Sequence, residues 1–370
     1  MPRSPRALVV AIFLGSRILV LASAHAGALL MTPEKHREWD WDPAKSDLFR
    51  GPAPPALLAP LVRWDANFYL LIAEYGYPAG HSEAKPNYVA NFFPLYPLVV
   101  RAVHRVGVDL FWAAIAVSNA ACLVAALLVY EIGRRRASGA AGVQSAALLL
   151  LAPGSHFLSL PYPEGLFAVL LAGALLAIFA NRPWVAALLG ALASATRSAG
   201  VVVFVALLYE AWVRRRDAGA ALRVAAAAIC SLGGAAAFAV FCSRAYGDPL
   251  LFVHTQALFG RTLSVVGPIK ALLRFDVDPD YYLVTAACVV AVVVMWRTIR
   301  GVESVVAAFL LALPLFTGTM KAMIRYQTVN LGLVAGIPRV APRAMRVVLI
   351  GCGILLVVET ALFGMGIGHN

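Results

Sequence analysis

The sequence has 370 residues, of which 61% are hydrophobic and only 14% are charged, and its formal net charge is +12. Soluble domains contain roughly 45–50% apolar and about 25% charged residues, so this composition excludes an ordinary soluble globular protein. A helix that spans a bilayer needs roughly 20 mostly apolar residues, and such runs recur along the chain. We therefore expect an all-α polytopic transmembrane bundle, a single integral membrane domain over residues 1–370, with about nine to eleven membrane helices.

The apolar runs lie, in chain order, at about 7–30, 111–132, 141–160, 164–180, 220–245, 281–296, 302–320 and 346–365. Shorter runs, interrupted by Pro, Arg or Gly, lie at 91–108, 184–213 and 326–338. The first run resembles a secretory signal, but Arg17 divides it and many spans follow, so we expect a retained membrane anchor. All five cysteines lie in apolar runs without metal-type spacing, which indicates neither disulfides nor zinc.

Orientation follows from Lys and Arg in short loops, which concentrate on the cytoplasmic side. A cytoplasmic N-terminus places the basic clusters at 134–136, 214–216, 297–300 and 339–346 on that side. Segment 184–213 then enters and leaves from the cytoplasm, with residues 196–200 at its outer tip. The external face receives the loops 31–110 and 246–280 and the segments 161–164 and 321–325. The positive charge is thus an orientation signal, and a nucleic-acid partner has little support.

The long first external loop, residues 31–110, is expected to carry interfacial helices. Within it, Trp64, Phe68 and Tyr75 recur at helical spacing, which predicts an amphipathic helix in the membrane interface over residues 63–77. Asp65 falls in the first turn of this helix, where the macrodipole favours an ionised carboxylate. A charged carboxylate beside the bilayer is suited to act as a general base, and simple capping of the helix is the alternative.

Two further external segments carry prolines. Segment 91–98, NFFPLYPL, has two prolines that disfavour a regular helix, and its aromatic residues either shape a lipid-tail groove or anchor the interface. The turn at 161–165, PYPEG, joins two spans. Its Glu164 is expected to contact an acceptor or to hold the base in place, with capping of the following helix as the alternative.

Cations supply the remaining candidate chemistry. Arg197 lies between two apolar half-helices, where an ionisable group is costly enough to suggest a function. The guanidinium fork matches phosphate oxygens, although a snorkelling Arg is the alternative. Arg325 and Lys321 form a second external cation cluster. The acidic stretch at 276–280 lacks the Gly and terminal Glu of a calcium-binding EF-hand loop, so a solvated loop is expected there.

Four motifs occur in order: WD at 64–65 with IAEYGY at 72–77, FFPLYP at 92–97, PYPEGLF at 161–167 and TRSAG at 196–200. Together they resemble the family of the second mannosyltransferase of GPI-anchor biosynthesis and its bacterial homologues (PIG-V-like), in the C-type (GT-C) superfamily of membrane glycosyltransferases. The resemblance runs from about residue 60 to residue 205. IRY at 324–326 is similar to the family's Arg-Tyr element, but the proline expected soon after it appears only at Pro338.

The resemblance implies an enzyme that transfers mannose from a polyprenyl-phosphate-mannose donor to a lipid-linked or other extracytoplasmic acceptor hydroxyl. Asp65 matches the expected catalytic base, and a base on the face opposite the leaving group gives inversion. Donor phosphate binding is assigned to Arg197, Arg325 and Lys321. Contacts with the acceptor or substrate are assigned to Glu164, Tyr162, Trp64 and Asn67. Because the cations can stabilise the leaving phosphate themselves, no metal and no cofactor is expected.

Several alternatives stay open. A second Trp-Asp pattern places the base at Asp40 or Asp42, which with Asp65 could even hold a divalent cation. The donor sugar could be another, such as arabinose. A lipid-linked sugar flippase would also have broken helices and buried cations, although the chain shows no convincing internal repeat. A pure scaffold leaves Asp65 and Arg197 unexplained. The preference for Ala, Val and Arg over Lys favours a bacterial plasma membrane, with the active site facing the periplasm or exterior.

Overall fold

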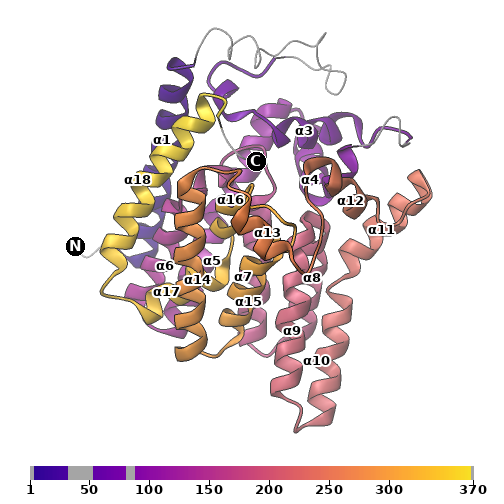
Figure 1. The fold of residues 1–370 in the computed structure, drawn as a ribbon, viewed down its shortest axis with the longest axis vertical. Coiled ribbons are helices and arrows are strands. Elements are labelled where there is room, and N and C mark those ends of the chain that lie inside the picture. The colour runs from indigo at the N-terminus through magenta and orange to yellow at the C-terminus, as the bar shows by residue number, and fades with distance from the viewer. Residues whose placement is uncertain (1–3, 32–52, 81–87, 368–370) are drawn as a thin grey trace.

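The computed structural model of the protein describes residues 4–31, 53–80 and 88–367, and all regular structure in these residues is helical (Figure 1). Five segments are long and apolar enough to cross a membrane: Pro5–Leu29 (α1), Leu110–Arg136 (α5), Ala218–Tyr246 (α10 and α11), Pro279–Thr298 (α14) and Met345–Gly364 (α18). Six shorter apolar helical segments accompany them: Gly139–Leu151 (α6), Glu164–Phe179 (α7), Pro183–Thr196 (α8), Ser198–Val213 (η4 and α9), Val302–Leu315 (α15) and Leu331–Val340 (α17). The expected fold class, a polytopic helical membrane bundle, is confirmed.

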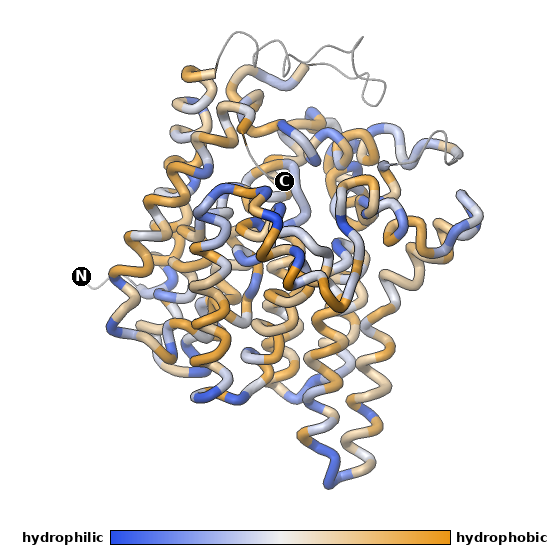
Figure 2. Tube along the Cα trace, viewed as in Figure 1, coloured by the Kyte–Doolittle hydropathy of each residue, from blue (hydrophilic) through white to orange (hydrophobic). Residues whose placement is uncertain are grey.

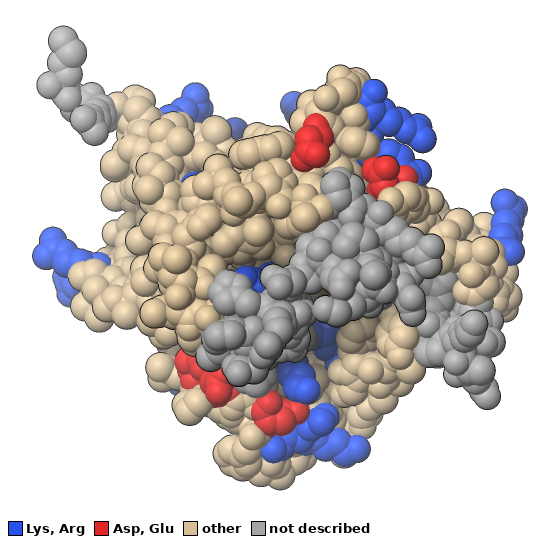
Figure 3. Space-filling model, turned by 90° about the horizontal axis from the view of Figure 1, so that it is seen from above, with Lys and Arg blue, Asp and Glu red and all other residues tan. Residues whose placement is uncertain are grey.

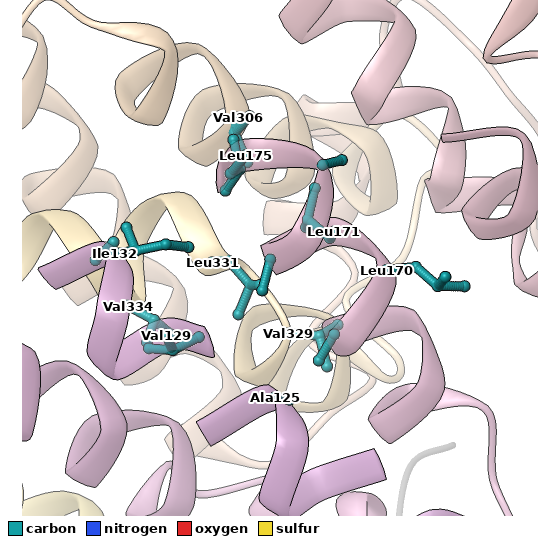
Figure 4. Packing of buried hydrophobic residues seen from close by; sticks show 14 of the residues in the cluster. Ala125, Val129, Ile132, Leu170, Leu171, Leu175, Val306, Val329, Leu331 and Val334 are labelled. Atoms are coloured by element: carbon teal, nitrogen blue, oxygen red, sulfur yellow. The ribbon is translucent and has the colours of Figure 1, made fainter. Parts of the chain in front are cut away.

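The largest buried cluster lies where α5, α7, α15 and α17 converge (Figure 4). Val129, Leu171, Val306 and Leu331, one from each helix, are fully buried there. In a bilayer the lipid tails are as apolar as these side chains, so close packing rather than removal from water stabilises the contact. This packing fixes the bundle from which the polar residues of the site project.

Small residues bring the first and last helices together. A Cβ atom built on Gly27 of α1 would lie 1.9 Å from the carbonyl oxygen of Ala361, and one on Gly364 of α18 would lie 2.1 Å from that of Ala24. Only glycine permits such close backbone contact between membrane helices. α1 and α18 therefore pack side by side, as Figure 1 shows.

The predicted run 141–160 is wrong as a single span. α6 ends at Leu151, and a turn with one 3-10 helix, Ser155–Leu158 (η3), leads to α7. Arg17 of α1 donates hydrogen bonds to the carbonyl oxygen of Leu150 at 3.0 Å and to the hydroxyl of Ser159 at 2.9 Å. These bonds satisfy both the guanidinium and a free helix-terminal carbonyl, so an irregular turn is tolerated between spans.

Three other runs are broken within their length. The predicted break of segment 184–213 is confirmed, because α8 ends at Thr196 and a short 3-10 helix precedes Val202–Val213 (α9). Two breaks were not predicted: residues 231–232 separate Ala218–Cys230 (α10) from Gly233–Tyr246 (α11), and α15 ends at Leu315.

The two ends of the bundle differ in chemistry. At one end, the turns from α9 to α10 and from α14 to α15 are hydrophilic and basic in sequence (Figure 2). Glu303 ties this end together, since its buried carboxylate accepts hydrogen bonds of 2.7 Å from both Arg136 and Arg339. The other end carries a cap of short helices: Asp65–Tyr75 (α3), Leu95–His104 (α4), Leu251–His254 (α12), Gly267–Leu273 (α13) and Met323–Thr328 (α16).

The cap helices refine two expectations. α3 forms as predicted, but it packs into the protein and buries Leu71 and Ile72, while Tyr75 is exposed. The expectation that prolines disfavour a helix after Asn91 is wrong for its second half. α4 begins at Leu95 and holds Pro97 in its first turn, where the missing N–H needs no partner.

Candidate active site

Asp65 is the first residue of α3 and follows a strained residue. Trp64 has φ 49° and ψ −119°, a conformation that residues other than glycine rarely adopt. Its indole ring packs edge-on against Phe363 of α18, with ring centroids 4.6 Å apart. Such strain persists only where surrounding contacts over-determine the backbone, and it commonly lies at functional sites. The strained turn directs the Asp65 carboxylate toward Arg325, whose Nη1 donates to Asp65 Oδ2 at 2.6 Å.

Four charged side chains form one continuous chain of ion pairs. Arg325 of α16 donates through Nη1 to Asp65 and through Nε to Oε1 of Glu164. Arg197, which has an extended backbone between α8 and the following 3-10 helix, donates to the same Oε1 of Glu164. The two arginines and Glu164 are buried, whereas the Asp65 side chain is 23% exposed. Asp65 is thus the member of this quartet with the most access to a ligand.

The quartet is electrically balanced, with two guanidinium groups and two carboxylates. Buried charges are tolerated when they are paired and hydrogen-bonded, and removing one partner leaves an uncompensated charge. The quartet also joins four separate parts of the chain, at the starts of α3 and α7, after α8 and within α16. The hydrogen-bonded ion pairs of the quartet therefore hold these four parts of the chain together.

Aromatic rings enclose the two arginines. The guanidinium carbon of Arg325 lies 4.6 Å from the ring centroid of Tyr162, and that of Arg197 lies 5.0 Å from the ring centroid of Tyr326. Both distances suit cation–π attraction. The hydroxyl of Tyr162 donates to the backbone carbonyl of Arg63 at 3.0 Å, so the turn before α7 also holds the chain just before Asp65.

The neighbouring titratable groups are poor proton acceptors. Burial raises the pKa of Tyr69 and of Tyr162 well above the usual range for a phenol, so both stay protonated at neutral pH. Burial lowers the pKa of His156 to about 3, which keeps its imidazole neutral. Burial acts to raise the pKa of Tyr326, but neighbouring guanidinium groups, that of Arg261 foremost, lower it overall.

A solvent-open cavity of about 580 Å³ lies against this quartet. It is lined by Asp65, Tyr69, Asn91, Phe92, Phe93, Thr196, Arg197, Ser198, Gln256, Phe259, Arg261, Arg325 and Tyr326. Seen from the cap end, Lys and Arg side chains show at the rim and in the middle of the face (Figure 3). A carboxylate and several cations therefore face one cavity, a combination suited to deprotonating a hydroxyl while stabilising an anionic leaving group.

Comparisons with known proteins identify the family of the chain. A family model described as Mannosyltransferase (PIG-V) matches residues 10–258, which is more than half of the chain. The chain belongs to the PIG-V mannosyltransferase family. The resemblance inferred from the four motifs is thereby confirmed.

GPI alpha-1,6-mannosyltransferase 2 of Rattus norvegicus is 33% identical over 170 residues, which cover 42% of this chain and 32% of that protein. The Mus musculus protein of the same name is 33% identical over 169 residues, with the same coverage. The Homo sapiens protein is 31% identical over 157 residues, which cover 40% of this chain and 30% of that protein. The chain thus matches about a third of the length of these PIG-V relatives.

The structure brings together only some of the residues that the PIG-V motifs suggested. Asp65, Arg197 and Arg325 line the cavity, while Glu164 and Tyr162 contact the arginines from positions outside its lining. Trp64, Asn67 and Lys321 are not in the lining either. Asp40 and Asp42 lie outside the described residues, so the alternative base stays untested. Within the described ranges, no three His, Cys, Asp or Glu side chains are grouped to hold a metal ion.

Other lining residues of this PIG-V family site were missed by sequence reasoning. Tyr69 lies four residues after Asp65, on the same face of α3, so helical spacing could have found it. Gln256 lies in a short 3-10 helix directly after α12, and Arg261 lies in the loop that follows it. Neither segment has a periodic pattern to indicate where it folds. Only the tertiary structure places them in one cavity with Asp65.

Proposed function

We propose that the protein transfers mannose from polyprenyl-phosphate-mannose to the hydroxyl of a lipid-linked or other extracytoplasmic acceptor. Membership of the PIG-V family supports the sugar and the reaction class. The observation that carries the proposal is the Asp65 carboxylate, partly exposed in a cavity that is otherwise lined by guanidinium groups and polar and aromatic side chains.

In the proposed reaction Asp65 is the general base. Arg325 occupies Oδ2, and we assign the other carboxylate oxygen to the proton of the acceptor hydroxyl. The acceptor oxygen bonds to the anomeric carbon as the bond between that carbon and the phosphate oxygen breaks. The proton passes to Asp65, and polyprenyl phosphate leaves with the bonding electrons. Attack on the face opposite the phosphate inverts the anomeric centre.

The buried cations stabilise the anion that forms. Arg197 and Arg325 line the cavity, so their fixed positive charges act on the departing phosphate more strongly in the transition state than in the ground state. Glu164 is buried behind both arginines and acts as a positioning residue in this proposal. Tyr162 acts similarly through the backbone of Arg63. Trp64 supports the turn before Asp65, and Asn67 stays a candidate for substrate contact.

The placement in the membrane follows from charge. The basic turns lie at the end opposite the cap, and Lys and Arg concentrate on the cytoplasmic side. We therefore propose that the cap and its cavity face the exterior or periplasm of a bacterial plasma membrane. Polyprenyl-linked donors and lipid acceptors reach such a site through the bilayer.

Radiolabelled sugar transfer into the total lipid extract of the source organism tests this function. Purified protein should transfer mannose from polyprenyl-phosphate-mannose and should leave the arabinose analogue largely unused. Preference for arabinose would correct the sugar while preserving the reaction class. Movement of the labelled donor across reconstituted vesicles without any transfer would contradict the proposal and favour a flippase.

A further inference from the structure

The buried quartet leaves the charge of an incoming phosphate uncompensated. Arg197 and Arg325 are already paired with Glu164 and Asp65, so the four groups together carry no net charge. A lipid phosphate adds at least one negative charge next to the Asp65 carboxylate. Additional cations near the cavity are needed to bind it, and the quartet does not contain them.

A second hollow, directly beside the first, supplies these cations. A groove of about 1230 Å³ shares Ser198, Gln256, Arg261 and Tyr326 with the Asp65 cavity, so the two are continuous. Its other lining residues are mostly apolar, but Arg261 and Lys321 both face it. Within the part of the chain that the structure describes, neither cation takes part in an ion pair.

The backbone holds Arg261 at this position. The left-handed Gly260, with φ 69°, turns the chain at the end of the 3-10 helix Thr255–Phe259 (η5). The next residues then bond to the end of α15: the amide of Thr262 donates to the carbonyl of Thr317 at 3.1 Å, and that of Ser264 to the carbonyl of Phe316 at 2.9 Å. Arg261 is therefore fixed between the Asp65 cavity and the end of a membrane helix.

An apolar extension continues the groove along α15. A neighbouring hollow shares Leu263 and Leu313 with the groove and is lined almost wholly by apolar side chains, among them Phe309 and Phe316. The three hollows together give one path from the carboxylate, past two cations, to an apolar surface of a membrane helix. This order of chemistry matches an amphiphile with a hydroxylated head, a phosphate and a long hydrocarbon chain.

We propose that Arg261 and Lys321 bind the phosphate of an isoprenoid monophosphate before the reaction, and we call this phosphate-binding site the seat. The hydrocarbon chain of the ligand lies along α15 and its sugar lies in the Asp65 cavity. This assignment rests on the proposed sugar transfer for the identity of the head group, but phosphate and chain recognition stand on the groove itself. An isoprenoid monophosphate suits this path better than a bulk phospholipid because it carries one hydrocarbon chain for the apolar extension along α15, whereas a bulk phospholipid carries two.

Binding of farnesyl phosphate to the full-length protein in detergent tests the seat directly. Arg261→Gln and Lys321→Gln should each raise the Kd by about tenfold, the usual effect of losing one charge-assisted contact. Arg261→Lys should retain part of the affinity. Arg244→Gln is the matched control, because Arg244 is an exposed cation near the end of α11 that is not among the lining residues of the groove or of the hollows beside it, and its Kd should stay within about twofold. Thermal stability without ligand should be similar in all variants.

Two related probes separate the contributions. Farnesol, which lacks the charge, and inorganic phosphate, which lacks the chain, should each bind at least about tenfold more weakly than farnesyl phosphate. Failure of the wild-type protein to bind farnesyl phosphate, or an equal Kd for the wild type and both glutamine variants, would overturn the seat. Equal competition by phosphatidylglycerol would reassign the groove to bulk lipid and also overturn it.

The binding assay does not depend on turnover, so the two proposals fail separately. Binding that requires Arg261 and Lys321 in a protein that transfers no mannose would retain the seat and reject the proposed function. Mannose transfer with an unchanged KM for the donor in both glutamine variants would retain the function and reject the seat.

Discussion

Arg325 donates a hydrogen bond of 2.6 Å to Asp65, although the two residues lie 260 positions apart in the chain. The N-terminal and C-terminal parts of the chain each supply one partner of this contact, because Asp65 begins α3 and Arg325 lies in α16. The family match extends from residue 10 to residue 258, so Arg325 is supplied by the part of the chain beyond it. The C-terminal part of the chain thus completes the candidate active site.

Replacement of Arg325 by Lys keeps the charge but removes the fork that reaches Asp65 and Glu164 together. A lysine ammonium is a point charge and does not reproduce the two fixed directions of a guanidinium. We expect the kcat for mannose transfer to fall by at least about tenfold because Asp65 is no longer held in position, with little change in thermal stability.

Arg339→Lys is the matched control for this change. Arg339 also pairs with a buried glutamate, Glu303, at 2.7 Å, but at the other end of the bundle. Its kcat should be unchanged. Equal losses of activity in the two variants would show that the effect of Arg325→Lys is not specific to the site.

Glu164→Gln should destabilise the protein because it leaves two buried guanidinium groups with one carboxylate. Breaking a buried ion pair by removing one partner costs about 3–5 kcal/mol. The double variant Glu164→Gln with Arg197→Gln restores the charge balance, so it should recover part of the lost thermal stability. Thermal unfolding of the purified variants checks this order, and a double variant less stable than Glu164→Gln alone would contradict the charge-balance explanation.

Transfer should persist in EDTA, because cationic side chains rather than a metal are proposed to stabilise the leaving phosphate. The measurement is the initial rate of mannose transfer before and after dialysis against the chelator. A rate that disappears and is restored by added divalent cation would reject this proposal. It would also revive the alternative in which Asp40 and Asp42 join Asp65 as ligands.

The four residues of the charged quartet were found from the sequence, whereas the contacts among them were not. Asp65 was found from helical spacing, and Arg197 from its place between two apolar segments. That Glu164 holds Arg197 and Arg325 together depends on helices that only tertiary packing brings side by side. A pattern along one segment contains no information about such a contact.

The ends of helices were also predicted poorly from the sequence, and the contacts of Arg17 show why. Hydropathy predicts one span over an apolar run such as 141–160. It contains no information about a distant guanidinium that hydrogen-bonds to a carbonyl within the run. Arg17 lies in another helix and donates a hydrogen bond to the Leu150 carbonyl, so the helix can end after Leu151 without leaving that carbonyl unpaired. An arginine inside an apolar run, such as Arg17, is a sequence signal for a partner of this kind, but it does not identify the partner.

The central claim is that Asp65 removes the acceptor proton, and one comparison tests it most directly. Mannose transfer from radiolabelled polyprenyl-phosphate-mannose is measured for the wild type, for Asp65→Asn and for Asp248→Asn, an aspartate of the cap end that is not in the cavity lining. Asp65→Asn should lose about 10²–10⁴-fold in kcat while still binding farnesyl phosphate, and Asp248→Asn should match the wild type. Wild-type turnover in Asp65→Asn would contradict the account.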